Sequence, residues 1–108
     1  MVGDDLFLQF SEGDEEVAEL FTDIGVKRNS ARVLVLMLRD IDLTSRMMER
    51  VCDLRQPEVS IALTDLMKRK WVRKIGQSGE GKGRPILLYR MGKTLEDILD
   101  ELKTEIVG

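Results

Sequence analysis

LRQPEVSIALTDL, residues 54–66, is the segment that decides the fold. Pro57 is tolerated in the first turn of a helix, because the early amides have no helical partner. Apolar residues then recur at helical spacing, at Val59, Ala62, Leu63 and Leu66, and the positions between them are mostly polar. This pattern predicts a helix to about residue 70. One of its faces lies in a core, and its amino-terminal end is free to enter a DNA groove.

A second predicted helix precedes this segment, and a basic hairpin follows it. Thr44 or Ser45 caps the earlier helix, whose apolar positions are Met47, Met48, Val51 and Cys52. Asp53 lies at the turn, where a positive φ is often required. Strands are predicted at residues 71–75 and 86–91, around a glycine-rich tip at 76–83. Together the three parts predict a winged helix-turn-helix.

Two further helices are expected before this region. Asp14 can cap the first of them, which ends at Gly25 and carries one apolar face: Val17, Leu20, Phe21 and Ile24. Asn29 or Ser30 starts the second, which is apolar nearly all round from residue 33 to 38 and is closed by residues 40–42. A helix with that pattern is expected at the centre of the domain.

The last segment, residues 94–107, is expected to form a helix capped by Thr94. It carries a narrow apolar stripe of Leu95, Ile98, Leu99, Leu102 and Ile106. Such a stripe is typical of a helix that pairs with a partner. We therefore expect a homodimer, which would match the two-fold symmetry of DNA operators. The alternative is that the stripe packs on its own domain.

The size and composition of the chain suit one compact domain. It has 108 residues, of which 43% are hydrophobic, enough to build a core. The fold class expected is α+β, mostly α. The winged helix-turn-helix domain would span residues 1–108, with its core at 28–91, a two-stranded wing, and a dimerisation helix at 94–107.

The distribution of charge also favours a DNA-binding module, although the net charge is −3. Between Thr44 and Arg90 the chain carries eleven basic and five acidic residues. Residues 1–43 carry four and ten, and residues 91–108 carry two and five. A basic centre with acidic ends is expected where separate helices form the core or a dimer interface. The alternative is an ordinary surface of mixed charge.

Side chains on the exposed face of the 54–70 helix are candidates to contact DNA bases: Gln56, Pro57, Ser60, Ile61 and Thr64. Gln56 can pair with adenine, and Ile61 can contact a thymine methyl group. Basic side chains are candidates for the DNA backbone and the minor groove: Arg46, Arg55 and Lys68, with Lys82 and Arg84 in the hairpin tip.

Several function classes are excluded or disfavoured. The longest apolar run, residues 33–38, is far shorter than the roughly 20 residues that span a bilayer, and the acidic start lacks signal-peptide features. One cysteine and no histidine fit a reducing cytosol and leave too few ligands for a metal site. No catalytic set or cofactor motif is present. We expect a cytoplasmic, non-enzymatic protein without a cofactor, whose partner is double-stranded DNA.

One motif resembles a known superfamily. Leu54-x-Gln56-Pro57-x-Val59-Ser60-x-x-Leu63-x-x-Leu66, followed by Trp71-Val72 and a hairpin with Gly83-Arg84-Pro85 and Tyr89, resembles the ArsR, MarR and TrmB-like winged-helix regulators of bacteria and archaea. The resemblance covers residues 28–91. It implies a sequence-specific, homodimeric transcriptional regulator that binds palindromic operators.

Three positions depart from that pattern. Arg55 stands where a Ser or Thr cap is frequent, Glu58 where Thr is common, and Ile61 where a basic or His side chain is frequent. Glu58 would repel phosphate, unless it points at a cytosine amino group or pairs with Arg55. These departures leave a second function open, namely a winged-helix adaptor that binds protein in a transcription complex without strong DNA specificity.

Overall fold

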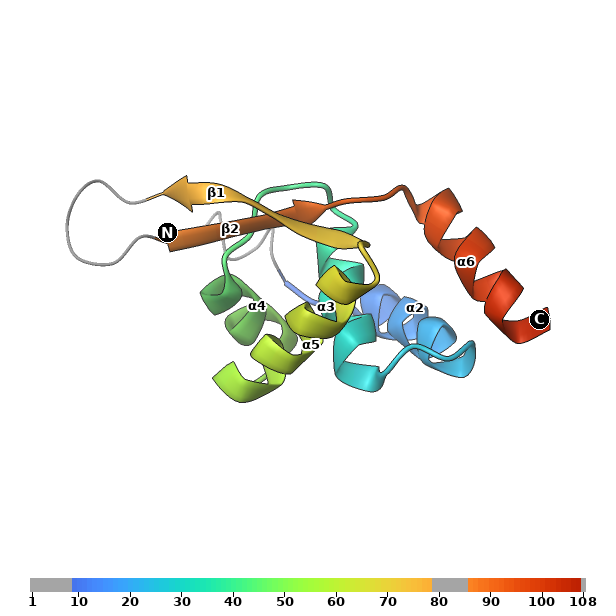
Figure 1. Ribbon diagram of the computed structural model, residues 1–108. Helices are drawn as coiled ribbons and strands as arrows, with labels where there is room; N and C mark the ends of the chain where they lie inside the picture. The colour runs from blue at the N-terminus through green and yellow to red at the C-terminus, as the bar shows by residue number, and fades with distance from the viewer. Residues whose placement is uncertain (1–8, 79–85, 108) are drawn as a thin grey trace.

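The computed structural model describes residues 9–78 and 86–107. Within these ranges the chain forms five helices and a two-stranded antiparallel sheet, the mostly helical α+β fold of a winged helix (Figure 1). The elements are α2 (Glu12–Asp23), α3 (Arg28–Met37), α4 (Ser45–Cys52), α5 (Gln56–Lys68), β1 (Val72–Ser78), β2 (Ile86–Met91) and α6 (Leu95–Val107). The predicted fold class is therefore confirmed.

Helix α3 is the centre of the core, as its continuous apolar run predicts. Residues 33–37 are all buried, and α3 packs against α2, α4 and α5. At the polar start of α3, the buried Ser30 hydroxyl donates a hydrogen bond of 2.8 Å to Asp65 Oδ2 of α5. This bond satisfies a polar group that burial would otherwise destabilise.

The starts of α2 and α3 differ from the predictions. Ser11, not Asp14, is the cap of α2: Ser11 Oγ accepts from the Asp14 amide at 3.1 Å, and Asp14 Oδ2 accepts from the Ser11 amide at 2.9 Å. Asp14 is thus the third helical residue of a capping box. Helix α3 begins at Arg28, after Lys27, which makes no side-chain capping bond. The predicted starts at Asn29 or Ser30 are therefore wrong by one or two residues.

Strand β1 is longer than predicted, and β2 also pairs with a residue outside the two strands. Strand β1 continues to Ser78 rather than ending at Ile75, with an irregularity in the pairing between Lys74 and Gly76. On its other edge β2 pairs with one residue of the α3–α4 loop. The Leu43 amide donates to the Tyr89 carbonyl at 3.0 Å, and the Tyr89 amide donates back at 2.8 Å. This bridge attaches the wing to the start of α4.

Helix α6 is anchored to the domain by its own apolar stripe. Thr94 Oγ1 accepts from the Asp97 amide at 3.1 Å, as expected of its cap. Ile98 and Leu102 are almost wholly buried within this one chain, whereas Leu95 and Leu99 are each 43% exposed. The side chain of Ile106 lies outside the described residues. The stripe therefore combines two pairs of residues, of which only one is buried by the chain itself.

Candidate nucleic-acid interface

Helices α4 and α5 form a helix-turn-helix whose turn is fixed from both sides. Thr44 Oγ1 caps α4 by accepting from the Met47 amide at 3.2 Å. Asp53 ends it in the left-handed conformation, with φ 58°, as the turn prediction requires. The guanidinium of Arg32 donates from Nε and Nη2 to the Cys52 carbonyl at 3.3 and 3.1 Å. This contact satisfies a carbonyl at the end of α4, which has no partner within the helix.

The exposed face of α5 carries the predicted base contacts. Val59, Ala62, Leu63 and Leu66 are buried, and the opposite face exposes Gln56, Pro57, Ser60, Ile61, Thr64 and Lys68. Ile61 is the most open of the large apolar residues described, at 65%. The candidate backbone contacts Arg46 and Arg55 are exposed as well.

Glu58 has a structural role at the start of α5. Its carboxylate accepts a hydrogen bond from the Arg55 backbone amide at 2.8 Å. A guanidinium carries no acceptor, so Arg55 cannot return the bond as Ser or Thr would. Glu58 thus accepts from the backbone of Arg55, rather than forming an ion pair with its side chain, and takes over part of the missing cap.

A cleft of about 160 Å³ lies between α5, the start of α4 and the base of the wing. Its lining is Ser45, Gln56, Ser60, Leu63, Thr64, Met67 and Tyr89. It brings together three of the predicted base contacts, Gln56, Ser60 and Thr64. The Thr64 hydroxyl donates to the Ser60 carbonyl at 2.9 Å, so toward a ligand it offers only lone pairs.

Ser45 and Tyr89 were not among the predicted site residues. Their place in the cleft depends on the Leu43–Tyr89 bridge, which joins segments 46 residues apart. A single bridging residue leaves no strand pattern in the sequence. The alternation of strand β2 could have marked Tyr89 as inward-facing, but not as a neighbour of α5.

Two arginines of the basic centre, Arg69 and Arg90, form ion pairs with acidic residues of the same chain. Arg90 donates to Asp40 Oδ1 and Asp42 Oδ1 at 3.4 and 3.2 Å. Arg69 forms ion pairs with Asp65 and Glu105 at 3.7 and 3.3 Å. Both arginines hold the wing or α6 to the domain rather than offering charge to a ligand.

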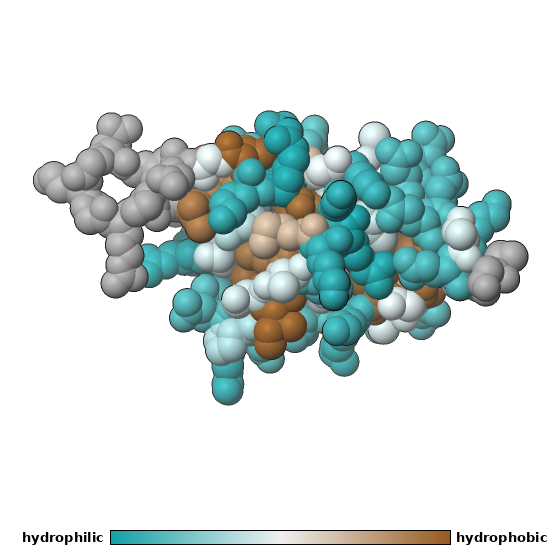
Figure 2. Space-filling view, viewed as in Figure 1, coloured by the Kyte–Doolittle hydropathy of each residue, from teal (hydrophilic) through white to brown (hydrophobic). Residues whose placement is uncertain are grey.

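Other basic side chains of this region are exposed and form no ion pair within the described ranges: Arg46, Arg55, Lys68, Lys70, Arg73 and Lys74. Lys82 and Arg84 of the predicted wing contact lie outside the described residues. The face seen in Figure 2 is largely hydrophilic, with apolar atoms exposed in small separate patches. The region around α5 therefore retains available positive charge.

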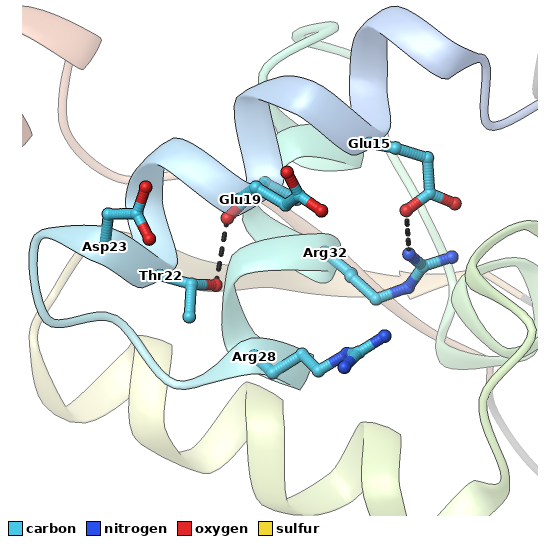
Figure 3. A pocket seen from close by; sticks show the side chains of 7 residues that line it. Glu15, Glu19, Thr22, Asp23, Arg28 and Arg32 are labelled. Carbon is cyan, nitrogen blue, oxygen red and sulfur yellow. Dashed lines mark hydrogen bonds and ion pairs between the residues drawn. The ribbon is translucent and has the colours of Figure 1, made fainter.

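A second cavity, of about 260 Å³, is lined by residues of α2 and α3 (Figure 3). Carboxylates of α2 face arginines of α3 across it, and Arg32 forms an ion pair with Glu15 at 2.5 Å. The same guanidinium holds the Cys52 carbonyl. Arg32 therefore connects α2, through Glu15, to the end of α4 at the turn of the helix-turn-helix.

Cys52 is a buried free cysteine, and burial raises the pKa of its thiol to about 12, which disfavours the reactive thiolate. Among the described residues no group of three His, Cys, Asp or Glu side chains is placed to hold a metal ion. No helix within the described ranges is long and apolar enough to cross a membrane.

Comparisons with known proteins identify the fold but no family. No protein-family model and no curated protein matches the chain. A possible transcriptional regulator from Methanosarcina mazei Go1 superimposes with a TM-score of 0.65 at 13% identity, covering 85% of this chain and 75% of that one. A second solved structure, of a transcriptional regulator, gives 0.64 at 11% identity, covering 86% of this chain and 62% of that one. This chain thus spans less than two thirds of the second protein, and it shares with both the winged-helix fold.

Proposed function

We propose that this protein is a homodimeric transcriptional regulator that binds specific sequences in double-stranded DNA. Helix α5 would lie in the major groove, and the wing would contact the minor groove or the backbone. The observation that carries the proposal is the division of α5 into a buried apolar face and an exposed face with Gln56, Ser60 and Thr64 at one cleft. Two proteins of similar fold, described as a possible transcriptional regulator and as a transcriptional regulator, support it.

Base reading would fall to the amino-terminal half of α5. The Gln56 amide can form two hydrogen bonds with an adenine edge, and Ile61 can pack on a thymine methyl group. Arg46, Arg55 and Lys68 would contact phosphates, together with Lys82 and Arg84 of the wing. On this proposal the protein acts in the cytoplasm, needs no cofactor and catalyses no reaction.

The dimer interface would use the exposed pair on α6, Leu95 and Leu99, since the domain itself buries Ile98 and Leu102. Helix α2 offers a second apolar pair, Val17 and Leu20, which are 38% and 62% exposed. Both helices are rich in acidic residues. Salt would therefore strengthen dimerisation by screening like charges, whereas it would weaken DNA binding by reducing counterion release.

The proposal is tested by selecting bound sequences from a random pool of double-stranded DNA. Enrichment of a two-fold motif is expected, with half-sites about one helical turn apart. On that DNA, Lys82→Glu with Arg84→Glu should weaken binding and flatten its salt dependence. Charge reversal at Lys27, exposed between α2 and α3, is the control and should change little. A pool without enrichment, at protein concentrations that saturate random DNA, contradicts the proposal.

A second candidate function is a protein-binding adaptor, and the exposure of Ile61 favours it. A large apolar side chain at the centre of an otherwise polar face suits a protein contact as well as a thymine methyl group. Ile61→Ser separates the two. For a DNA reader the change lowers preference for one base pair, whereas for an adaptor it leaves DNA binding unchanged.

A further inference from the structure

Tyr89 is a buried residue whose hydroxyl forms no hydrogen bond with a described residue. Tyr89 is only 8% exposed and lines the cleft beside α5. Its side chain makes no hydrogen bond to any residue in the described ranges. Yet no fully buried side-chain oxygen there lacks a partner. The hydroxyl must therefore remain accessible, and the cleft is where Tyr89 meets open space.

A basic residue lies opposite Tyr89 in the sheet. Lys74 is the register partner of Tyr89 in the antiparallel sheet, and residues directly opposite each other project from the same face. Lys74 is exposed and forms no ion pair with a described residue. The wing thus presents an ammonium group and a phenol on the side of the sheet that borders α5.

The start of α4 completes the cleft from the other side. Leu43 pairs with Tyr89, and the chain then passes through Thr44 into Ser45, whose side chain also lines the cleft. Thr44 Oγ1 satisfies the Met47 amide, which leaves the Ser45 and Arg46 amides at a helix start without helical partners. The positive end of the helix dipole lies there, and the lining includes no carboxylate.

We propose that this cleft binds one phosphate group of the DNA backbone. The Tyr89 and Ser45 hydroxyls and the first amides of α4 would donate hydrogen bonds, and Lys74 would supply charge. The inference rests on the proposed function and adds to it three residues outside the predicted set. The bound phosphate would fix the register of α5 on the duplex, so that Gln56 and Ser60 of the same cleft meet a defined base step.

Neutral donors and the cation can be separated experimentally. On DNA obtained by selection, Tyr89→Phe and Ser45→Ala should each weaken binding about tenfold without changing the salt slope, because no charge is lost. Lys74→Gln should reduce the slope by about 0.9, the value for one phosphate contact. Thr104→Ala, which deletes a hydroxyl exposed on α6, is the control and should leave affinity unchanged. Urea denaturation of each variant shows that the fold is intact.

The phosphate is then located by placing a single uncharged methylphosphonate at each backbone position in turn. At one position per half-site the Tyr89→Phe and Ser45→Ala losses should disappear, since their acceptor is gone. If both variants bind natural DNA like the unaltered protein, the phosphate site is overturned while the proposed function stands. If the unaltered protein enriches no sequence, the proposed function itself fails.

A third arm titrates inorganic phosphate at constant ionic strength and follows the Ser45 and Arg46 amide resonances. Saturable shifts abolished by Tyr89→Phe, with no methylphosphonate position sensitive to the variants, would assign the cleft to a free anion and overturn the assignment to DNA. Saturable resonance shifts, together with a methylphosphonate position at which the variants lose their effect, support the assignment of the cleft to a DNA phosphate.

Discussion

Replacing Glu58 separates its role in capping helix α5 from the effect of its negative charge on the proposed DNA binding. Its carboxylate accepts from the Arg55 amide at 2.8 Å and lies in the first turn of α5, where the helix dipole favours negative charge. Glu58→Ala removes both contributions. A lost cap costs about 1 kcal/mol and a lost dipole interaction about 0.5 kcal/mol, so we expect a destabilisation of about 1.5 kcal/mol. For a domain of this size the melting temperature would fall by about 6 °C.

Glu58→Gln keeps an oxygen that can accept from the Arg55 amide and loses only the charge. We expect it to destabilise the protein by about 0.5 kcal/mol. Both variants remove one negative charge near the surface proposed to face phosphates. At about 8 Å in water, a pair of unit charges interacts by about 0.5 kcal/mol. DNA should therefore bind about twofold more tightly to both variants.

Urea denaturation, followed by the fluorescence of the single tryptophan, measures the first effect, and fluorescence anisotropy with selected DNA measures the second. Glu16→Gln, an equal charge change on the exposed face of α2, is the control for both. Equal destabilisation by Ala and Gln would refute the capping role. Loss of discrimination at one base pair would show instead that Glu58 reads a cytosine amino group.

Four further outcomes follow from individual side chains of the fold. Hydrogen bonds from Lys93 and the Trp71 indole lower the pKa of Glu101, so its stabilisation holds at neutral pH and is lost as pH falls through the lowered value. Acid below the ordinary pKa range of a glutamate should shift Trp71 fluorescence, and Glu101→Gln should abolish that step. Because Cys52 is buried and burial raises the pKa of its thiol to about 12, the thiol should react with a thiol reagent at pH 8 only when the protein unfolds, so that urea accelerates the reaction. Ile98→Ala should destabilise the domain by about 2–4 kcal/mol in urea. Leu99→Ser should change stability by less than about 0.5 kcal/mol, yet shift the monomer–dimer equilibrium measured by sedimentation.

Features that depend on neighbours in the sequence are predictable here. Thr44 as a cap, Asp53 in the left-handed turn and Pro57 in the first turn of α5 each depend on a few adjacent residues, and all three are confirmed. The error at the start of α2 is also local, because Ser11 and Asp14 are both residues that can cap a helix. Ser11 is the cap, and Asp14, three residues later, accepts from the Ser11 amide in a capping box.

Features that depend on distant pairing are not predictable in this way. The Leu43–Tyr89 bridge decides which side chains border α5, but it involves one residue on each side. The apolar stripe of α6 reads as continuous, although packing buries Ile98 and leaves Leu99 exposed. Hydrophobic spacing identifies a face of a helix and does not identify what covers it.

The positive charge of the central segment has the same limitation, because counting charges treats every arginine alike. Arg69 lies 4.5 Å above the Trp71 ring and pairs with acids of α5 and α6, and Arg90 is held by the α3–α4 loop. Such contacts fix the position of an element, and they leave less charge for a phosphate. Lys74, by contrast, has no acidic partner among the described residues and is the register partner of Tyr89, whose hydroxyl forms no hydrogen bond with a described residue. Net charge along the chain therefore overstates what the arginines could contribute to the proposed DNA binding, and the basic positions without an acidic partner among the described residues are the better candidates to bind a phosphate.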